Sequence, residues 1–402
     1  MKILWVNNIF LHPTTKGGQI RTLEMLRRLH QRHEIHYVSF DDPDNREGPR
    51  RASEYSTRSH AIRYQIAPKR SLRFLAQLAA GVVSSLPVVV ARKRSAEMRS
   101  LLAELIEREH FDCVVCDFLT PSINLPQLER AVLFQHNVES MIWRRYVDNA
   151  ADPLRRAYFR LQARRLENYE RRVCRQVARV IVVSQTDAET MQKMFGVQDV
   201  FPVPTGVDVD HFVPPDPPPA LTTDLAFVGS MDWLPNIDGI QYFVSEVMPL
   251  IRKTRPACSL AIIGRTPPPS ILELARQDPT IRVTGTVPDI RPHLWSSAVS
   301  IVPLRIGGGT RLKIYESMAA RVPVVSTTIG AEGLDVRHPE HIRLADSAED
   351  FARHCLGLLD DPVERRRQAD AALDLVASRF SWEHVTRCFE SLLTPAQPHS
   401  AK

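Results

Sequence analysis

Short apolar runs alternate with longer amphipathic segments through the first half of the chain. Runs rich in Val, Ile and Leu predict buried strands at 2–7, 35–40, 61–66, 112–117, 131–135 and 180–184. Segments in which apolar residues recur every three or four positions predict helices at 17–33, 72–83, 94–109 and 152–176. Strands that alternate with helices in this way are typical of a parallel sheet with helices on both faces.

A proline-rich run interrupts this rhythm near the middle of the chain. The sequence Val213-Pro-Pro-Asp-Pro-Pro-Pro-Ala220 cannot continue a helix or enter a central strand, because proline lacks the backbone N–H. The alternation then resumes, with strands predicted at 224–229, 259–264, 281–285, 299–303, 322–326 and 342–344 and helices at 236–254 and 314–320. The pattern predicts two doubly wound, Rossmann-like α/β domains that face each other across a cleft, with the proline-rich run as the hinge.

The expected boundaries follow from these patterns. Residues 1–205 are predicted to form the N-terminal domain and residues 206–378 the C-terminal domain. Residues 379–394 are expected to form a last helix that packs back on the first domain, with Ser381 as its N-cap and Trp382 buried. The tail at 395–402 is expected to be disordered.

The composition is that of a soluble globular protein with an excess of arginine. Hydrophobic residues make up 44% of the chain and charged residues 24%, the formal net charge is +6, and only 8 of the 52 cationic residues are lysine. An arginine-rich surface favours phosphate groups or anionic membranes. Nucleic acid is not an expected partner, because the sequence has no recognised binding motif and no strip of interleaved basic and aromatic residues.

An uncharged stretch at 74–91 has basic residues on both sides, but it is too short and too polar to predict a membrane span. Together with the arginines at 144–172 it can form a surface that rests on an anionic bilayer. A buried helix pair with solvated ends is the alternative. The sequence shows no signal peptide, so we expect a cytoplasmic protein, with peripheral contact at the inner face of the cytoplasmic membrane as one of these two alternatives.

Two of the six cysteines, Cys113 and Cys116, have the spacing of a redox motif. They fall in a predicted strand, where residues three apart point to opposite faces of the sheet. We therefore expect buried thiols in a reducing compartment rather than a disulfide or a metal site.

A glycine-rich turn at 307–309 carries the clearest candidate chemistry. It lies between a predicted strand and a predicted helix, so free backbone N–H groups and the positive end of the helix dipole face the turn. Arg311 and Lys313 add positive charge, and the carboxylate of Glu316 can accept hydrogen bonds from hydroxyl groups. A solvated loop is the alternative, but open α/β sheets bind ligands at the carboxyl ends of their strands. The turn favours a ligand with a phosphate end and a polyol end, such as a sugar nucleotide.

Several motifs together resemble those of the GT-B glycosyltransferases, and most closely the retaining family 4 enzymes. These motifs are the Gly17-Gly18 turn, the segment Pro204-Thr-Gly-Val-Asp-Val-Asp-His-Phe212 and the block Glu316-Ser-Met-Ala-Ala-Arg-Val-Pro-Val-Val-Ser326. The resemblance covers roughly 1–390 and is strongest at 204–334. The Gly-Gly-Gly-Thr-Arg-x-Lys pattern is similar to a subtype among exopolysaccharide and exosortase-associated sugar transferases. The resemblance implies a donor nucleotide sugar on the second domain and a glycan or polyprenol-linked acceptor on the first.

The resemblance also implies roles for individual residues. Glu316 matches the glutamate that binds the ribose hydroxyls, and His136 matches a first-domain histidine near the donor sugar; a hydrogen-bonded core histidine is the alternative for His136. The expected catalytic residues are His136, Arg311 and Lys313. The expected donor-binding residues are Gly17, Gly18, Gly229, Ser230, Arg265, Thr286, Val287, Gly308, Gly309, Thr310 and Glu316.

Two departures from the family pattern bear on the mechanism. The first glutamate of the family motif would fall at 308, where this chain has Gly308, and the basic residues usual after Gly229 are missing. A departing nucleoside diphosphate gains negative charge, so Arg311 and Lys313 stand where they could supply the lost positive charge. Arg265 is a third candidate, with a solvated loop residue as the alternative.

The sequence favours a metal-independent, retaining glycosyltransferase without any cofactor. Asp208-Val-Asp210 has the Asp-x-Asp pattern of a metal site, but the resemblance places it in the segment between the domains, so we interpret these residues as turn and cap residues. The sequence shows no cluster of residues with the spacing of zinc ligands. The rival functions are a sugar-nucleotide epimerase of the same fold and a catalytically silent sugar-nucleotide-binding protein, which the loss at Gly308 would suit. The sequence names neither the sugar, nor the base, nor the acceptor.

Overall fold

A computed structural model describes residues 1–14, 17–43, 45–64, 84–148, 152–306 and 311–393. The chain divides into two compact units. Unit 1 contains Met1–Pro204 together with the chain from Val385 onward, and unit 2 contains Thr205–His384. The predicted helix at 72–83, the glycine turn at 307–309 and the tail at 395–402 lie outside the described residues.

Unit 1 is built on a seven-stranded parallel sheet in the order β3-β2-β1-β4-β5-β6-β7. Its strands are β1 (Lys2–Val6), β2 (Glu34–Asp41), β3 (Arg58–Arg63), β4 (Cys113–Asp117), β5 (Ala131–Phe134), β6 (Arg179–Val182) and β7 (Val200–Pro202). The central strand β1 pairs with β2 on one side and with β4 on the other. The inner strands are almost wholly buried, which explains why they could be predicted from their apolar runs.

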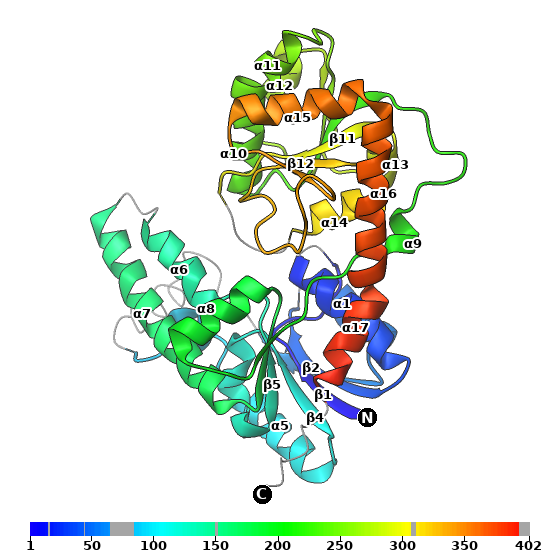
Figure 1. Ribbon diagram of the computed structural model, residues 1–402. Coiled ribbons are helices and arrows are strands. Elements are labelled where there is room, and N and C mark those ends of the chain that lie inside the picture. The colour runs from blue at the N-terminus through cyan, green and yellow to red at the C-terminus, as the bar shows by residue number, and fades with distance from the viewer. Residues whose placement is uncertain (15–16, 44, 65–83, 149–151, 307–310, 394–402) are drawn as a thin grey trace, which may run out of the picture. The chain divides into compact units, whose positions relative to one another are not determined.

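Helices cover both faces of this sheet (Figure 1). The helices are α1 (Gly17–His30), α2 (Glu47–Arg50), α4 (Val88–Ala91), α5 (Ala96–Arg108), α6 (Glu139–Asp148), α7 (Pro153–Gln176) and α8 (Gln185–Phe195), with short 3₁₀ turns at Ala52–Glu54, Thr120–Asn124 and Leu128–Arg130. One core joins Leu4 and Val6 of β1 to α5, α7 and α8. On the other face, Trp5 packs against Phe389, with ring centroids 5.7 Å apart.

Phe389 belongs to the last helix, α17 (Trp382–Ser391), which starts in unit 2 and continues into unit 1. The hydroxyl of Ser381 accepts a hydrogen bond from the backbone N–H of His384, so the predicted N-cap is confirmed. In unit 1, Glu390 forms ion pairs with Arg32 and His33. Trp382 is buried, and it lies within unit 2, against Gly206.

Unit 2 repeats the same plan with a six-stranded parallel sheet in the order β10-β9-β8-β11-β12-β13. Its strands are β8 (Thr223–Val228), β9 (Leu260–Ile263), β10 (Ile281–Val283), β11 (Ser297–Val302), β12 (Val324–Ser326) and β13 (Arg343–Leu344). Its helices are α9 (Val209–Phe212), α10 (Leu234–Tyr242), α11 (Met248–Arg252), α12 (Pro269–Gln277), α13 (Arg291–Trp295), α14 (Leu312–Ala319), α15 (Ala348–Asp360) and α16 (Pro362–Arg379). A π turn at Phe243–Val247 joins α10 to α11, so the helix predicted at 236–254 is real but irregular.

Two apolar cores lie on opposite faces of the second sheet. One joins Leu225 and Phe227 to α10, α11, α12 and α15, and the other joins Val302 and Val324 to α9, α14 and α16. The prediction of two doubly wound α/β units is confirmed. The proline-rich run at 213–220 lies inside unit 2, between α9 and β8, and the chain passes from one unit to the other earlier, at Pro204–Thr205.

In both sheets the order in which successive strands are added reverses beside the first strand. In unit 1 the reversal lies between β1 and β4, and in unit 2 it lies between β8 and β11. The loops that leave these strands diverge to opposite faces, which opens a crevice at the carboxyl ends where ligands bind in open α/β sheets. The predicted site residues follow these strands and their neighbours.

Candidate active site

In unit 2 the site begins where β8 and β9 end. The backbone of Gly264 approaches Gly229 so closely that a Cβ on Gly264 would lie 1.8 Å from the Gly229 carbonyl oxygen. A Cβ on Gly229 would in turn lie 2.7 Å from Nζ of Lys313. Position 264 therefore requires glycine, because its neighbour is backbone, and the contact at Gly229 brings a lysine from α14 to the end of β8.

Two contacts hold the ammonium group of Lys313. Its Nζ donates a hydrogen bond of 2.8 Å to Oδ1 of Asn236 and lies 4.3 Å from the ring centroid of Phe227. Nδ2 of Asn236 donates to the Ser230 carbonyl oxygen at 2.7 Å, so the buried Asn236 links Lys313 to the turn after β8. Burial and the neighbouring Arg311 lower the pKa of Lys313 to about 7, against the opposing effect of Glu316.

Glu316 lies one turn after Lys313 on α14. Burial raises the pKa of the Glu316 carboxyl to about 7, although the Lys313 charge opposes this shift. Within the described part of the chain, no hydrogen bond or ion pair joins this carboxylate to another side chain. A desolvated ammonium and a desolvated carboxyl thus lie side by side at the start of one helix.

The two predicted arginines of unit 2 are held by other groups. Arg311 is 3% exposed, and its guanidinium donates to the Ile329 carbonyl oxygen at 2.9 Å and lies 3.6 Å from the Glu332 carboxylate. Nε of Arg265 donates to the Ser230 hydroxyl at 2.8 Å, and its guanidinium lies 3.4 Å from Asp232. Arg311 therefore links the start of α14 to the loop after β12. Arg265 holds two side chains, Ser230 and Asp232, of the turn after β8.

The other predicted donor-binding residues of unit 2 differ in how far they are exposed and in what they contact. Thr286 and Val287 follow β10, where Gly285 takes a left-handed conformation with φ +68°. Thr286 is exposed, while Val287 packs on a small apolar cluster that includes Ala261. Gly308, Gly309 and Thr310 lie outside the described residues.

In unit 1, His136 follows β5 and is buried beside Asp117, the last residue of β4. Nε2 of His136 lies 2.7 Å from Oδ1 of Asp117. The imidazole stacks on Phe118, with centroids 3.9 Å apart and planes 10° apart. Burial lowers the pKa of His136 despite the nearby Asp117 carboxylate, so the imidazole is neutral at pH 7.

Gly17 and Gly18 form the first residues of α1, and Gly18 lies close to this histidine. A Cβ on Gly18 would lie 2.8 Å from Cζ of Phe118 and 3.5 Å from Nδ1 of His136. The structure thus brings Gly18, Phe118 and His136 together in unit 1, and Gly229, Ser230, Lys313 and Asn236 together in unit 2.

Sequence reasoning missed Asp117, Phe118 and Asn236. Asp117 could have been noticed as a polar residue that closes an otherwise apolar strand beside the reversal of the sheet. Phe118 has a φ of +72°, which is strained for a residue with a side chain, and this cannot be seen in the sequence. Asn236 carries no signal, because its role depends on a lysine 77 positions away.

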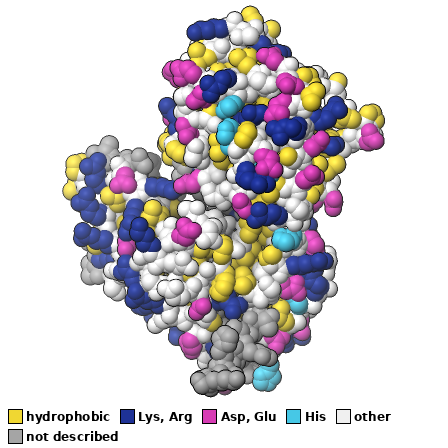
Figure 2. All heavy atoms as spheres, in the orientation of Figure 1, with side chains coloured by type: hydrophobic (Ala, Val, Ile, Leu, Met, Phe, Trp, Pro, Cys, Tyr) yellow, Lys and Arg dark blue, Asp and Glu magenta, His cyan; other side chains and the backbone are white. Residues whose placement is uncertain are grey.

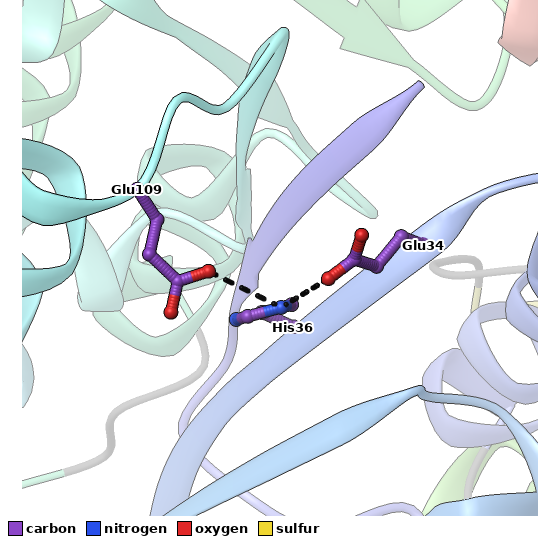
Figure 3. A group of neighbouring side chains, drawn as sticks. All are labelled: Glu34, His36 and Glu109. Atoms are coloured by element: carbon purple, nitrogen blue, oxygen red, sulfur yellow. Dashed lines mark hydrogen bonds and ion pairs between the residues drawn. The ribbon is translucent and has the colours of Figure 1, made fainter.

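Other polar groups have a structural explanation. Asp208 caps α9 by accepting from the backbone N–H of His211, as its interpretation as a cap predicted. Cys113 and Cys116 are buried thiols that form no disulfide. Among the described residues, one group has the spacing of metal ligands, namely Glu34, His36 and Glu109 (Figure 3). It lies at the amino ends of β1 and β2, and the Lys2 ammonium, 2.5 Å from the Glu109 carboxylate, already supplies a positive charge there.

Arginines concentrate on α6 and α7. Eight are exposed on these two helices, at 144, 145, 155, 156, 160, 164, 172 and 175. Figure 2 shows dark blue side chains gathered where Figure 1 draws α6 and α7. Two exposed apolar side chains, Tyr146 and Leu154, lie among them. In the described part of the chain, no helix combines the length and the apolar character needed to cross a membrane.

Two family models match the chain, one over each unit. The model described as Glycosyltransferase Family 4 matches residues 15–211, and the model described as Glycosyl transferases group 1 matches residues 222–361. Two doubly wound parallel-sheet units fit the GT-B fold, and the two family models identify a glycosyltransferase. The chain belongs to the family 4-like glycosyltransferases, as its motifs predicted.

Solved structures share this fold over almost the whole chain. Sucrose-phosphate synthase from Thermosynechococcus elongatus is 16% identical, with a TM-score of 0.68 and 98% of each chain covered. HepE from Anabaena in complex with UDP is 13% identical, with a TM-score of 0.68 and coverage of 98% of this chain and 100% of that one. WaaG, a glycosyltransferase involved in lipopolysaccharide biosynthesis, is 13% identical with a TM-score of 0.64 and the same coverage.

One curated relative comes from Klebsiella pneumoniae, an uncharacterized 44.6 kDa protein in the cps region. It is 21% identical over 269 residues, which are 64% of this chain and 68% of the relative.

Proposed function

We propose that this glycosyltransferase moves a sugar from a nucleoside diphosphate sugar to a hydroxyl group of a glycan or lipid-linked glycan, with retention of configuration. The observation that carries the proposal is the position of Lys313, whose ammonium group lies against Gly229 at the reversal of the second sheet. The family pattern has basic residues after β8, and this chain has none in that turn. Lys313 reaches the same place from α14.

Charge explains what Lys313 would do there. When the bond between the anomeric carbon and the diphosphate oxygen breaks, the leaving group gains negative charge, and stabilising that charge lowers the barrier. A desolvated ammonium is a strong partner for a phosphate because little water must be removed when the two meet. Arg311 fixes the segment from which Lys313 extends, and the amides of Gly308, Gly309 and Thr310 would complete the diphosphate site.

The remaining donor contacts follow from the chemistry of each group. The Glu316 carboxylate would accept hydrogen bonds from the ribose hydroxyls, and the backbone at Thr286 and Val287 would recognise the base. Gly17, Gly18 and His136 would contact the donor sugar, as the resemblance implies. UDP bound to HepE, a solved structure of the same fold, supports a nucleotide ligand but does not fix the base.

Retention without a protein nucleophile is consistent with front-side attack. In this path the acceptor oxygen bonds to the anomeric carbon on the face from which the diphosphate leaves. The acceptor hydroxyl gives its proton to an oxygen of the departing diphosphate. No metal is needed for this charge balance if Lys313 and Arg311 are charged in the complex, so turnover should survive an excess of EDTA unchanged.

The proposed acceptor is a growing surface glycan of a polysaccharide pathway, reached at the inner face of the cytoplasmic membrane. The cps region of the Klebsiella relative and the lipopolysaccharide role of WaaG support this acceptor class. The exposed arginines of α6 and α7, with Tyr146 and Leu154 among them, would provide the contact with anionic headgroups.

Vesicle flotation tests this contact. Each arginine near an anionic surface contributes about 1 kcal/mol, so reversing Arg160 and Arg164 to glutamate should weaken binding to phosphatidylglycerol vesicles by at least about 30-fold. The matched control reverses Arg366 and Arg367 of α16 and should bind as the wild type does. Equal binding of both double variants would contradict the membrane contact.

Donor binding and turnover test the function itself. A thermal-shift panel of UDP, GDP, ADP and TDP sugars should select one nucleotide, and release of its diphosphate should require an acceptor glycan. Lys313→Ala should lower kcat/KM by about 100-fold or more, because a lost transition-state contact of this type costs at least ~2.7 kcal/mol. Conversion of the nucleotide sugar to its isomer without transfer would instead show an epimerase, and unchanged turnover in Lys313→Ala would remove the assigned role.

A further inference from the structure

The buried pair of Asp117 and His136 assigns a role to a residue outside the family motifs. We propose that Asp117 is a positioning residue that fixes the proton of His136 on Nε2, so that Nδ1 accepts a hydrogen bond from a sugar hydroxyl at the amino end of α1. The hydroxyl ligand rests on the proposed function, whereas the position of the proton does not.

The contacts of Asp117 determine which nitrogen carries the proton. Oδ2 of Asp117 accepts hydrogen bonds from Trp5 Nε1 at 3.1 Å, Asn7 Nδ2 at 2.6 Å and Thr22 Oγ1 at 2.8 Å. Oδ1 is left for His136 Nε2 at 2.7 Å. A carboxylate held by three donors is an acceptor only, so the fourth contact requires a hydrogen on Nε2. In a neutral imidazole the lone pair then resides on Nδ1.

The ring cannot easily turn to exchange its nitrogens. Phe118 stacks on one face of the imidazole, and the ring of Phe134 lies 4.5 Å away at 48°. Phe118 occupies its place at the expense of a left-handed backbone with φ +72°. Strain of this kind persists only where the surrounding structure over-determines it, and it concentrates at functional sites.

Nδ1 of His136 is buried and has no hydrogen-bond partner in the part of the chain that the structure describes. A Cβ at position 18 would lie only 3.5 Å from this nitrogen, so Gly18 keeps the approach from α1 open. A buried acceptor without a donor is destabilising, and this cost is recovered when a ligand supplies the donor.

The chemistry of the lone pair selects the ligand. Burial keeps the imidazole neutral, so Nδ1 offers only an acceptor. A phosphate oxygen is also an acceptor and is therefore unsuited to this place, whereas a hydroxyl can donate. The lone pair thus selects the sugar rather than the diphosphate. Because three donors already share the charge of Asp117, the pair is a poor stabiliser of an imidazolium, which separates this role from that of a general base.

Asp117→Asn provides a test with an unusual signature. An asparagine at 117 presents one acceptor and one donor group, and its oxygen should face the three donors Trp5, Asn7 and Thr22. Its NH₂ group would then point at Nε2 of His136, so the proton of the imidazole should move to Nδ1. Thr22→Val is the matched control, because it removes one donor from Oδ2 and leaves the His136 contact unchanged.

Histidine ¹⁵N NMR of the full-length protein reads the two tautomers directly and needs no ligand. We expect the Nε2–H form of His136 in the wild type and in Thr22→Val, and the Nδ1–H form in Asp117→Asn. The Nδ1–H form in the wild type, or an unchanged tautomer in a folded Asp117→Asn protein, would overturn the proposal. If Asp117→Asn does not fold, the test is still decisive, because the tautomer of His136 in the wild type can by itself refute the assignment.

Steady-state kinetics test the part of the proposal that concerns the sugar hydroxyl. For the donor that the panel selects, Asp117→Asn should reduce kcat/KM about 10- to 100-fold, the usual range for residues that orient a functional ligand. Thr22→Val should change it less than about threefold by comparison. Equal losses in both variants would indicate general destabilisation and contradict a positioning role. If no nucleotide sugar is turned over, the proposed function fails, while the NMR result still decides the tautomer.

Discussion

The ammonium group of Lys313 predicts how donor affinity depends on pH. Burial lowers its pKa to about 7 in the free protein, and a bound diphosphate would return it toward its ordinary value of 10.5. Because the pKa is lower in the free state than in the complex, binding takes up a proton above pH 7 and affinity falls as the pH rises. Below pH 7, Lys313 is charged in both states, so it contributes no pH dependence there.

The magnitude follows from this shift. With a pKa of about 7, Lys313 is about nine-tenths protonated at pH 6 and about one-tenth protonated at pH 8, so Kd should rise about tenfold, or ~1.4 kcal/mol. Glu316 titrates in the same range and works in the opposite direction, because its ionised form is the better acceptor for ribose hydroxyls. The lysine is therefore measured best in Glu316→Gln, where the carboxyl no longer titrates. Because the Glu316 charge raises the pKa of Lys313, that pKa falls further in this variant, and the rise in Kd should be at least about tenfold.

Isothermal titration calorimetry is the appropriate assay. A nucleotide sugar should be used rather than a free nucleoside diphosphate, because the terminal phosphate of the latter also titrates near pH 7. In Glu316→Gln, titrations in buffers of different ionisation enthalpy should show uptake of nearly one proton at pH 8. In the double variant with Lys313→Met, both the uptake and the rise in Kd should disappear. A flat Kd in Glu316→Gln between pH 6 and pH 8, or an equal slope without Lys313, would refute the reasoning.

Three further predictions concern glycines and an ion pair. Gly18→Ala places a Cβ 2.8 Å from Phe118 Cζ, so turnover should fall at least about tenfold while the free energy of unfolding drops by about 1–3 kcal/mol, as steady-state kinetics and urea unfolding would show. Gly264→Ala meets the Gly229 carbonyl oxygen at 1.8 Å and should destabilise unit 2 by about 3 kcal/mol or more, and wild-type stability in urea would contradict this close approach. Although burial opposes its charge, hydrogen bonds from Arg32 and His33 lower the pKa of Glu390. Glu390→Gln should therefore cost about 1 kcal/mol at pH 7 and progressively less as the pH falls through this lowered pKa, and a loss that does not shrink as the pH is lowered would exclude the ion pair as its cause.

Most strands of both sheets could be predicted because the inner strands are buried on both faces and read as continuous apolar runs, whereas the edge strand β7 was not predicted. The edge strand β3 was predicted at 61–66 but lies at Arg58–Arg63, because a half-exposed strand such as Arg-Ser-His-Ala-Ile-Arg has no such run. Helices such as α8 and α16 were not assigned, and in α16 arginines and short alanines obscure the helical period. The local sequence thus predicted the central strands better than the edge strands and the helices that cover the sheets.

The site could be predicted only in part, for a related reason. The positions of Gly229, Lys313 and Glu316 follow from motifs at strand ends, since a parallel sheet brings those ends to one edge. The contacts of these residues do not, because Lys313 meets Asn236 across 77 residues and His136 meets Asp117 across 19. Arg311 illustrates the difference, because its sequence position beside Lys313 gave no sign that its guanidinium contacts the carbonyl of Ile329.

The discontinuity of unit 1 has a consequence for synthesis on the ribosome. Phe389 packs on Trp5 and Phe134, and Arg179 donates to the carbonyl of Leu392, so this unit draws its last core residues from the segment that follows unit 2. Unit 2 is continuous in sequence, whereas unit 1 combines Met1–Pro204 with residues that follow unit 2. Unit 1 therefore begins first but is completed only after unit 2 has been made, and until then the place of α17 on its sheet stays uncovered, open to chaperones and to premature contacts.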